Sequence, residues 1–311
     1  MSESHHVPVL MSECLTLLEP KPGGRFIDCT VNGGGHSAAL LERTAPDGPL
    51  LGLDADPNAM PAATSRLNPY GTRVTLIQTN FRFVGRVARS EGFGSVDGVL
   101  LDLGLSSNQL DTPGRGFSFN RDEPLDMRFD PSSGISAAQY VAAASREDIE
   151  HTLRTLGEEP RARRIAANIV EARQDSPIAT TGQLARLVSR AVGGRHGRIH
   201  PATRVFQALR MAVNDELGAL AEALPQALTL LRHGGRLAVI SFHSLEDRLV
   251  KTFLRHMAGV VEPAPRGIPI IPVAPVTEMR ILTRRPVGAA ADEVAANPRS
   301  RSARLRVAER L

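Results

Sequence analysis

The feature that most constrains this fold is an alternation of short apolar runs with helical patterns, which stops between residues 103 and 234 and then resumes. Each early connection has room for the crossover helix that a parallel strand pair requires. Two final runs, 278–283 and 302–307, are expected to pair antiparallel. The sequence therefore predicts an α/β protein with a mostly parallel, Rossmann-like sheet and antiparallel strands at its end. The other expected strands are 25–31, 49–54, 73–78, 96–102 and 235–242.

The interruption has helical character, because no run from 136 to 231 alternates as a strand does. An irregular stretch precedes it. We therefore expect a discontinuous α/β domain, 1–133 and 213–311, with an all-helical insert at 134–212. The helices expected in this region are 136–144, 146–156, 161–173, 181–192 and a longer one at about 200–231.

Positive charge is concentrated in the insert. The chain has a net charge of +4, but residues 161–210 contain ten arginines and two acids, so the remainder is net negative by about 4. Such a cluster favours a nucleic-acid-binding face; a solvated helical surface is the alternative. Tyr140 and Phe206 are the only aromatic residues of the insert, which favours recognition of RNA shape and backbone over base stacking.

Other features concern the cellular compartment. There are two cysteines, Cys14 and Cys29, and no zinc-knuckle spacing, so we expect a reducing compartment and no metal site. The first residues do not resemble a signal peptide, and no run of about 18 apolar residues occurs. We expect a cytoplasmic protein that does not interact with membranes, and a homodimer is left open.

A nucleotide-type pocket is expected at the carboxyl ends of the strands, where open α/β sheets bind ligands. The glycine cluster 32–36 follows the first run, and Asp54 and Asp102 end the second and fourth runs. Asp54 lies 19 residues after Gly35, a spacing typical of an acid that binds ribose hydroxyls. A tight turn alone could explain the glycines, but not the two acids in register.

The glycine loop departs from the dinucleotide pattern, because NGGGH does not satisfy G-x-G-x-x-G. S-adenosylmethionine has no pyrophosphate and does not need that pattern. Its positive sulfonium also suits acids near the loop, such as Asp28 and Asp102. We therefore expect S-adenosylmethionine as the cofactor, with NAD as the alternative.

Several long sequence blocks resemble the bacterial MraW/RsmH family, and they cover nearly the whole chain in one order. The resemblance implies a cytosine-N4 methyltransferase of small-subunit (16S) ribosomal RNA, acting on a decoding-region base of free RNA or of the assembled subunit. The matching blocks are HVPVL at 6–10, TVNGGGHS at 30–37, DGVLLDLGLSS at 97–107, RGFSF at 115–119, PLDMR at 124–128, HPATRVFQALRMAVNDEL at 200–217, GGRLAVISFHSLEDR at 234–248 and NPRSRSARLR at 297–306.

The resemblance also implies a set of residues that bind the cofactor. Without the resemblance, Phe81 could equally be a core aromatic residue, and His36 could cap the turn that follows it. For Gln109 the sequence alone indicates no function. The implied cofactor-binding residues are Gly34, Gly35, His36, Asp54, Phe81, Asp102 and Gln109.

Asp102 is the candidate catalytic residue, because an acceptor for the cytosine amine would orient its lone pair toward the methyl group. The position lacks the Pro-Pro-aromatic sequence that many amino-methyltransferases have after this strand, so a role restricted to the cofactor is the alternative. His243 could also be an ordinary residue at a strand end, and Asp247 and Arg248 an exposed pair. The candidate substrate-binding residues are Ser241, His243, Asp247 and Arg248 after the fifth run, and Arg161, Arg163, Arg164, Arg204 and Arg210 around the insert.

Three functions remain open from the residues alone: an RNA methyltransferase, a nicotinamide oxidoreductase, and a non-catalytic RNA-binding module on a Rossmann scaffold. Asp54 and Asp102 together argue against the last, because a module without a cofactor has no need for both acids at the strand ends.

Overall fold

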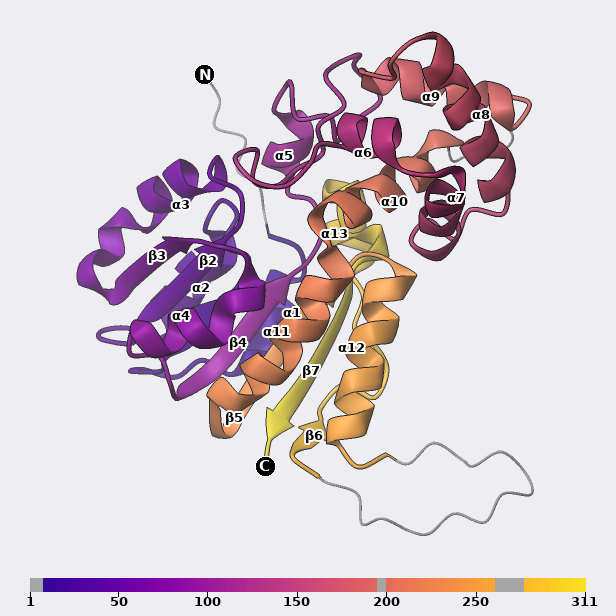
Figure 1. The fold of residues 1–311 in the computed structure, drawn as a ribbon. Helices are drawn as coiled ribbons and strands as arrows, with labels where there is room; N and C mark the ends of the chain where they lie inside the picture. Colours follow the sequence, from indigo (N-terminus) through magenta and orange to yellow (C-terminus); the bar gives the residue numbers. More distant parts are fainter. Residues whose placement is uncertain (1–7, 195–199, 261–276) are drawn as a thin grey trace, which may run out of the picture. The chain divides into compact units, whose positions relative to one another are not determined.

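The computed structural model describes residues 8–194, 200–260 and 277–311 (Figure 1). The chain forms two compact units, residues 1–104 with 217–311 and residues 105–216. The proline-rich connection at 263–275 and residues 195–197 of the turn-rich segment 193–197 lie outside the described residues. No described helix is long and apolar enough to span a membrane.

The first unit contains a seven-stranded sheet in the order β3-β2-β1-β4-β5-β7-β6. The pairs from β3 to β5 are parallel, whereas β7 runs antiparallel to both β5 and β6. The predicted fold class is confirmed, since each expected strand is present and the last two pair as expected. The strands are β1 (Phe26–Asp28), β2 (Leu50–Asp54), β3 (Val74–Gln78), β4 (Val96–Asp102), β5 (Leu231–Ser241), β6 (Met279–Ile281) and β7 (Arg304–Arg310).

Helices cover both faces of this sheet (Figure 1). Neighbouring residues of a strand point to opposite faces, so Ile27 packs with α4, α11 and α12, while Phe26 packs with α1, α2 and α3. The central strands β1 and β2 are therefore buried on both faces, as strands of parallel sheets are, whereas the edge strand β3 is only partly buried. The helices of this unit are α1 (Met11–Leu18), α2 (Gly35–Arg43), α3 (Ala59–Leu67), α4 (Val84–Ser90), α11 (Glu216–Leu230), α12 (Ser244–Met257) and α13 (Ala291–Ala296), with short 3-10 turns at Asn68–Arg73, Phe81–Phe83 and Pro298–Ser302.

The second unit is helical and has its own core. Capping boxes at Ser136, Ser145 and Thr180 fix the starts of three of its helices. Asp215 adopts a left-handed conformation with φ of 46°, and this turn divides the single helix expected at 200–231 into α10 and α11. The helices of the unit are α5 (Ser107–Asp111), α6 (Ala137–Ala143), α7 (Arg146–Thr155), α8 (Ala162–Asp175), α9 (Thr181–Ala191) and α10 (Ala202–Asn214).

The helical unit begins at Leu105 and ends at Glu216, outside the boundaries of 134 and 212 expected from the sequence. The irregular segment before 134 belongs to it because Phe117, Leu125 and Met127 are buried in the helical core. Backbone hydrogen bonds from Ala137 to Asp126 and from Ala138 to Leu125 join that segment to α6. A stretch without periodicity thus completes the core of the helices that follow it.

Candidate cofactor and catalytic site

The loop after β1 is held against the end of β2 by Asp54. One oxygen of its carboxyl group accepts the backbone N–H of Asn32, and the other accepts that of Asp56, each over 2.8 Å. Asn32 and Gly34 have φ of 50° and 75°, a left-handed conformation that asparagine and glycine tolerate. The sequence of the loop therefore lets its backbone reach the acid.

Asp54 retains hydrogen-bonding capacity toward a ligand. A carboxylate oxygen has two lone pairs, and each oxygen of Asp54 uses one on a backbone N–H. The side chain is 7% exposed, and burial raises its pKa to about 6 against the lowering effect of the two N–H groups. Its geometry suits a pair of neighbouring hydroxyls such as those of a ribose.

Asp28 is a second buried acid next to the loop. It is 1% exposed and accepts hydrogen bonds from the Thr30 backbone N–H and the Ser37 hydroxyl, over 3.1 Å and 2.6 Å. Burial raises the pKa of Asp28 to about 6 in spite of these donors. The pair Asp28–Ser37 connects the end of β1 to the first turn of α2.

Asp102 ends β4, and its Oδ1 atom is buried without a hydrogen-bond partner among the described residues. Burial, followed by the charges of Asp28 and Glu246, raises the pKa of Asp102 well above its usual value. An unpartnered buried carboxyl oxygen is energetically costly. This atom is the clearest sign in the α/β unit of a place where a ligand binds.

His36 lies between Asp102 and the N-terminal segment. Its Nε2 is 3.1 Å from the Val9 carbonyl oxygen, and its Nδ1 is 3.7 Å from Asp102 Oδ2. A carbonyl oxygen can only accept, so Nε2 carries a proton. The structure thus brings together Gly34, His36, Asp54 and Asp102, four of the residues expected to bind the cofactor.

The other expected cofactor-binding residues are placed differently. A Cβ atom on Gly35 would lie 2.2 Å from Pro8 Cγ, so this chain's own packing requires glycine there. Phe81 follows β3 and packs, half-buried, against the core. Gln109 lies in α5 of the helical unit, and its role stays an expectation of the resemblance.

Sequence reasoning missed two residues that build the site, Thr30 and Asn32. Asn32 acts through its backbone N–H, and Thr30 accepts the Asp102 backbone N–H over 2.6 Å. Both lie in the loop that the glycines marked, but the partners were visible only once the strands were placed side by side.

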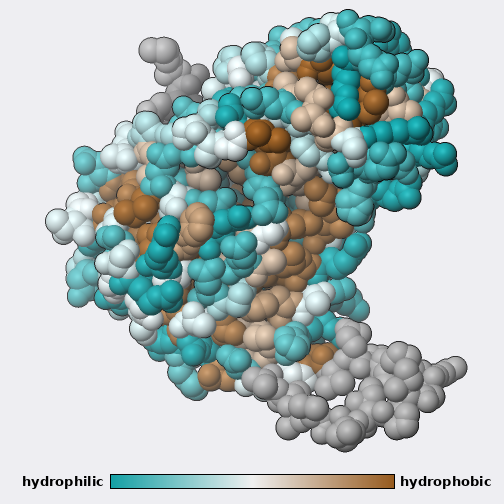
Figure 2. All heavy atoms as spheres, in the orientation of Figure 1, coloured by the Kyte–Doolittle hydropathy of each residue, from teal (hydrophilic) through white to brown (hydrophobic). Residues whose placement is uncertain are grey.

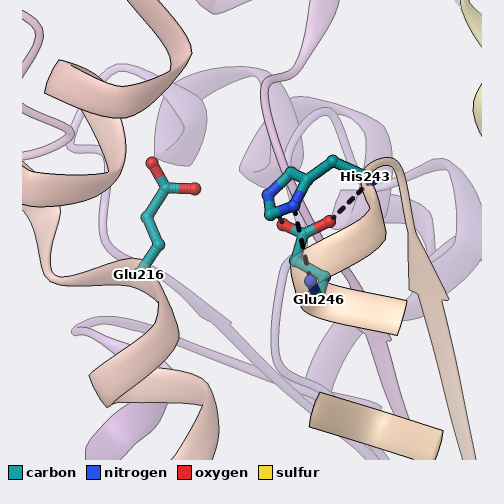
Figure 3. A group of neighbouring side chains, drawn as sticks. All are labelled: Glu216, His243 and Glu246. Atoms are coloured by element: carbon teal, nitrogen blue, oxygen red, sulfur yellow. Dashed lines mark hydrogen bonds and ion pairs between the residues drawn. The ribbon is translucent and has the colours of Figure 1, made fainter. Parts of the chain in front are cut away.

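The segment after β5 forms structural contacts rather than a set of free polar groups. The Ser241 hydroxyl donates to the Arg304 carbonyl on β7, and His243 caps α12 in a capping box with Glu246. Figure 3 shows the His243 ring beside the Glu246 side chain. The Nε2 atom of His243 is 3.1 Å from a carboxylate oxygen of Glu246. These contacts weaken the expectation that Ser241 binds substrate.

Asp247 is not part of an exposed pair with Arg248, which was the alternative considered. It is 7% exposed and binds Arg306 through both carboxylate oxygens, over 2.6 Å and 3.1 Å. Burial raises its pKa, but Arg306 and Arg304 outweigh burial and hold the pKa below its usual value. Asp247 therefore anchors α12 to β7, while Arg248 is exposed.

The arginines expected to bind RNA differ in availability. Arg163, Arg164 and Arg204 are exposed, and the surface over α7, α8 and α9 is mostly hydrophilic on the face in Figure 2. Arg210 instead forms a buried, two-bond ion pair with Glu216 over 2.7 Å and 2.8 Å. Arg161 donates to the Val192 carbonyl oxygen. These two arginines serve the packing of the helical unit.

A parallel sheet that ends in a reversed strand, with acids at its switch point, defines a Rossmann-like α/β protein of the methyltransferase type. This chain belongs to the MraW methylase family, whose family model matches residues 3–311. Family membership agrees with the resemblance seen in the sequence and favours a methyltransferase over a nicotinamide oxidoreductase.

Relatives match over nearly the full chain. A ribosomal RNA small subunit methyltransferase H of Thermomicrobium roseum is 55% identical, covering 98% of this chain and 94% of that protein. The protein of the same name from Symbiobacterium thermophilum is 52% identical, covering 99% and 97%. A solved methyltransferase homolog from Pyrococcus horikoshii is similar over 97% of this chain and 66% of that one, at 13% identity and a TM-score of 0.43.

Proposed function

We propose that this chain transfers a methyl group from S-adenosylmethionine to the exocyclic N4 of a cytosine in 16S ribosomal RNA. The observation that carries the reaction is the buried, unpartnered Oδ1 of Asp102 at the end of β4 in a methylase fold. The names of the relatives support the RNA substrate. The choice of cytosine N4 rests on the family resemblance.

The acids of the pocket fit a cationic cofactor. Among the described contacts, the carboxyl groups of Asp28 and Asp54 accept backbone N–H groups and the Ser37 hydroxyl, and Asp102 Oδ2 lies 3.7 Å from His36 Nδ1. These contacts include no arginine or lysine. Asp28 and Asp54 are buried and Asp102 is partly buried, with a side chain 16% exposed; without an arginine or lysine beside them, such acids disfavour their own ionisation. When bound, S-adenosylmethionine would supply both a positive charge and the methyl group. Asp54 would accept hydrogen bonds from its ribose, and Gly34 would keep the loop backbone close to it.

Asp102 would hold the cytosine amine and accept its proton. Methyl transfer would break the sulfur–methyl bond of the cofactor, leave S-adenosylhomocysteine and form the N–C bond. Because a neutral amine then carries one proton too many, an N–H bond must also break. Oδ1 of Asp102 is the free acceptor for that hydrogen, and the raised pKa of this carboxyl makes it a better base than an exposed aspartate. The other oxygen of Asp102 faces His36, whose Nδ1 is 3.7 Å away and whose Nε2 is held by the Val9 carbonyl oxygen.

The helical unit, 105–216, would bind the RNA. Its exposed arginines Arg163 and Arg164 are the main proposed phosphate contacts. Arg204 is a further candidate, because it is exposed and gives only one long hydrogen bond, 3.3 Å, to the Glu158 carbonyl oxygen. Arg210 is withdrawn because it is paired with Glu216, and Arg161 because it donates to the Val192 carbonyl oxygen. Arg248 remains a candidate in the α/β unit. The protein would act in the cytoplasm, where its substrate is made and assembled.

The test is mass spectrometry of nucleosides from 16S RNA and from small subunits, each treated with the protein and isotope-labelled S-adenosylmethionine. Label in N4-methylated cytidine is expected from at least one substrate, and the comparison identifies which. The matched control is Asp47→Asn, an exposed acid outside the site. Label only on carbon-5, on a ribose oxygen or on DNA would refute the substrate assignment.

A further inference from the structure

The helical unit contains a groove between α8 and α9 that the proposed contacts do not use. Its volume is about 810 Å³, a size that accommodates more than one nucleotide-sized group. It is lined by the end of α8, by one side of α9, and by the rings of Phe119 and His200. All of its lining residues belong to the helical unit.

One side of α9 gives the groove its polar wall. Gln183, Arg186 and Arg190 follow one another at helical spacing and line the groove, so their side chains are neighbours on one face. The opposite face of α9 is buried in the core through Leu184 and Val188, while the buried side chain of Leu187 lines the groove beside the polar residues. Arg190 is exposed, and Arg186 forms a long, exposed ion pair with Asp122 at 3.7 Å.

An aromatic pair gives the groove a second wall. Phe119 and His200 are stacked, with ring centroids 4.6 Å apart, and Phe206 meets Phe119 edge-on at 5.0 Å. His200 Nδ1 accepts the Ala202 backbone N–H, so its Nε2 carries a proton that can be donated. Phe119 was not counted in the sequence-based view of the insert, because it precedes residue 134.

These contacts change the expected mode of RNA recognition. The scarcity of aromatic residues favoured shape and backbone recognition, but Phe117, Phe119 and Phe129 all belong to the helical unit. Phe206 is one of the two aromatic residues expected in the insert. It is only 4% exposed, and its ring packs edge-on against that of Phe119. Cations beside aromatic rings are the combination that single-stranded nucleic acid binds.

We propose that this groove binds an unpaired segment of the substrate RNA, with bases against Phe119 and His200 and phosphates on Arg186 and Arg190. This proposal rests on the proposed function, since it assumes an RNA substrate. It adds a preference between single-stranded and duplex RNA: the groove would hold single-stranded RNA rather than a duplex. A rigid A-form helix would present its phosphates but not its base faces.

The experiment measures binding of the full-length protein to a fluorescent single-stranded RNA and to an RNA duplex over a range of salt. Arg186→Ala with Arg190→Ala should weaken single-strand binding about 10-fold and flatten its salt slope by about 1.4, the value for two lost single-strand contacts. Duplex binding should change less. The matched control is Arg146→Ala with Arg154→Ala, two exposed arginines on α7 outside the groove.

A second measurement tests the aromatic wall. Phe119→Leu should weaken single-strand binding, while Phe119→Tyr, which keeps the ring, should restore it; unfolding midpoints establish that both variants are folded. Ultraviolet crosslinks from 4-thiouridine RNA are expected on the peptides that contain Phe119 and residues 183–190. Crosslinks confined to other surfaces, or an unchanged salt slope in the arginine variant, would overturn the groove assignment.

The two proposals fail differently. If the variants methylate 16S RNA normally and bind single strands as the wild type does, the groove assignment is wrong and the proposed reaction stands. If the wild-type protein binds neither RNA and labels no ribosomal RNA, the proposed function fails with it.

Discussion

The backbone N–H of Asp102 donates a hydrogen bond to the side-chain hydroxyl of Thr30 over 2.6 Å. This bond joins the end of β4 to the loop after β1, across two neighbouring parallel strands. The Thr30 backbone N–H in turn donates to Asp28. The two acids of adjacent strand ends are therefore positioned through one threonine, and the geometry of the proposed catalytic residue depends on the cofactor loop.

Replacing this threonine tests the dependence. Thr30→Val keeps the shape but removes the acceptor of the Asp102 N–H, so we expect the free energy of unfolding to fall by about 1–3 kcal/mol. Affinity for S-adenosylmethionine, measured by calorimetry, should fall as well because Asp102 loses its anchor. Thr72→Val, at an exposed position, should stay within about 0.5 kcal/mol of wild type. If Thr30→Val and Thr72→Val changed stability and cofactor affinity equally, the hydrogen bond from Asp102 to Thr30 would have no role in positioning Asp102.

Asp28 should make the free protein less stable as pH rises. Its pKa is about 6 in the folded protein and near 3.8 without burial, so between these values the folded state holds more protons than the unfolded state. The free energy of unfolding must then fall with rising pH across that window, by about 3 kcal/mol from this group.

Asp28→Asn removes this titration and keeps one acceptor for the Thr30 N–H. Urea unfolding should show a variant that is more stable than wild type at pH 7, with a difference that shrinks toward pH 4. Pairs such as Asp247–Arg306 titrate in the opposite sense, because their acids have lowered pKa values, so only the difference between the proteins is informative. A difference that does not vary with pH would contradict the assignment.

Asp54→Ala should weaken binding of S-adenosylmethionine and S-adenosylhomocysteine alike, because both carry the ribose. The loss of hydrogen bonds to a charged acceptor predicts about 2–4 kcal/mol, measured by calorimetry. NAD should bind neither protein. Because Asp54 also holds the Asn32 and Asp56 N–H groups, unfolding midpoints are needed beside the affinities. Asp47→Asn is the control, and tight NAD binding would count against the cofactor assignment.

The elements that could be predicted from the sequence are those with a periodic pattern of apolar residues, namely the strands and helices. The strand ends at Asp54 and Asp102 followed from alternating runs and the carboxyl-edge rule, and family blocks added His36. The sheet was therefore predictable to within a few residues at most strand ends, including its reversed last strand.

Contacts between distant residues were not predictable from pattern. Asp247 and Arg306 are 59 residues apart in sequence, and neither shows from its neighbours that it will be buried against the other. The segment that carries Phe117 and Met127 has no periodicity, so its place in the helical core became visible only when backbone bonds joined it to α6. For the same reason Arg210, buried on Glu216, could not be distinguished from exposed arginines.

Exposed arginines and the ion-paired Arg210 should respond differently to replacement by alanine. Arg163→Ala with Arg164→Ala should leave stability nearly unchanged and flatten the salt slope of RNA binding by about 2 units. Arg210→Ala removes the two charged hydrogen bonds that the carboxylate of Glu216, 8% exposed, accepts, so it should destabilise the protein by about 2–4 kcal/mol. Chemical unfolding and salt-dependent RNA binding separate the two outcomes. An RNA defect in a fully stable Arg210→Ala protein would return that residue to the RNA contacts.

Asp102→Asn tests the chemistry itself. Asparagine keeps the size and one acceptor oxygen, but it removes the base that would take the amine proton and the charge that would favour a cationic cofactor. An interaction that strengthens in the transition state should cost about 10²–10³-fold in turnover when it is lost. If Asp102 served only the cofactor, saturating S-adenosylmethionine would restore most of the rate, whereas a proton acceptor cannot be replaced in this way. The assay is the appearance of N4-methylcytidine in 16S RNA at several cofactor concentrations, with Asp47→Asn as the matched acid. A variant that reaches the wild-type rate at saturation would reduce Asp102 to a cofactor-binding residue and leave the acceptor of the proton to be found elsewhere in the pocket.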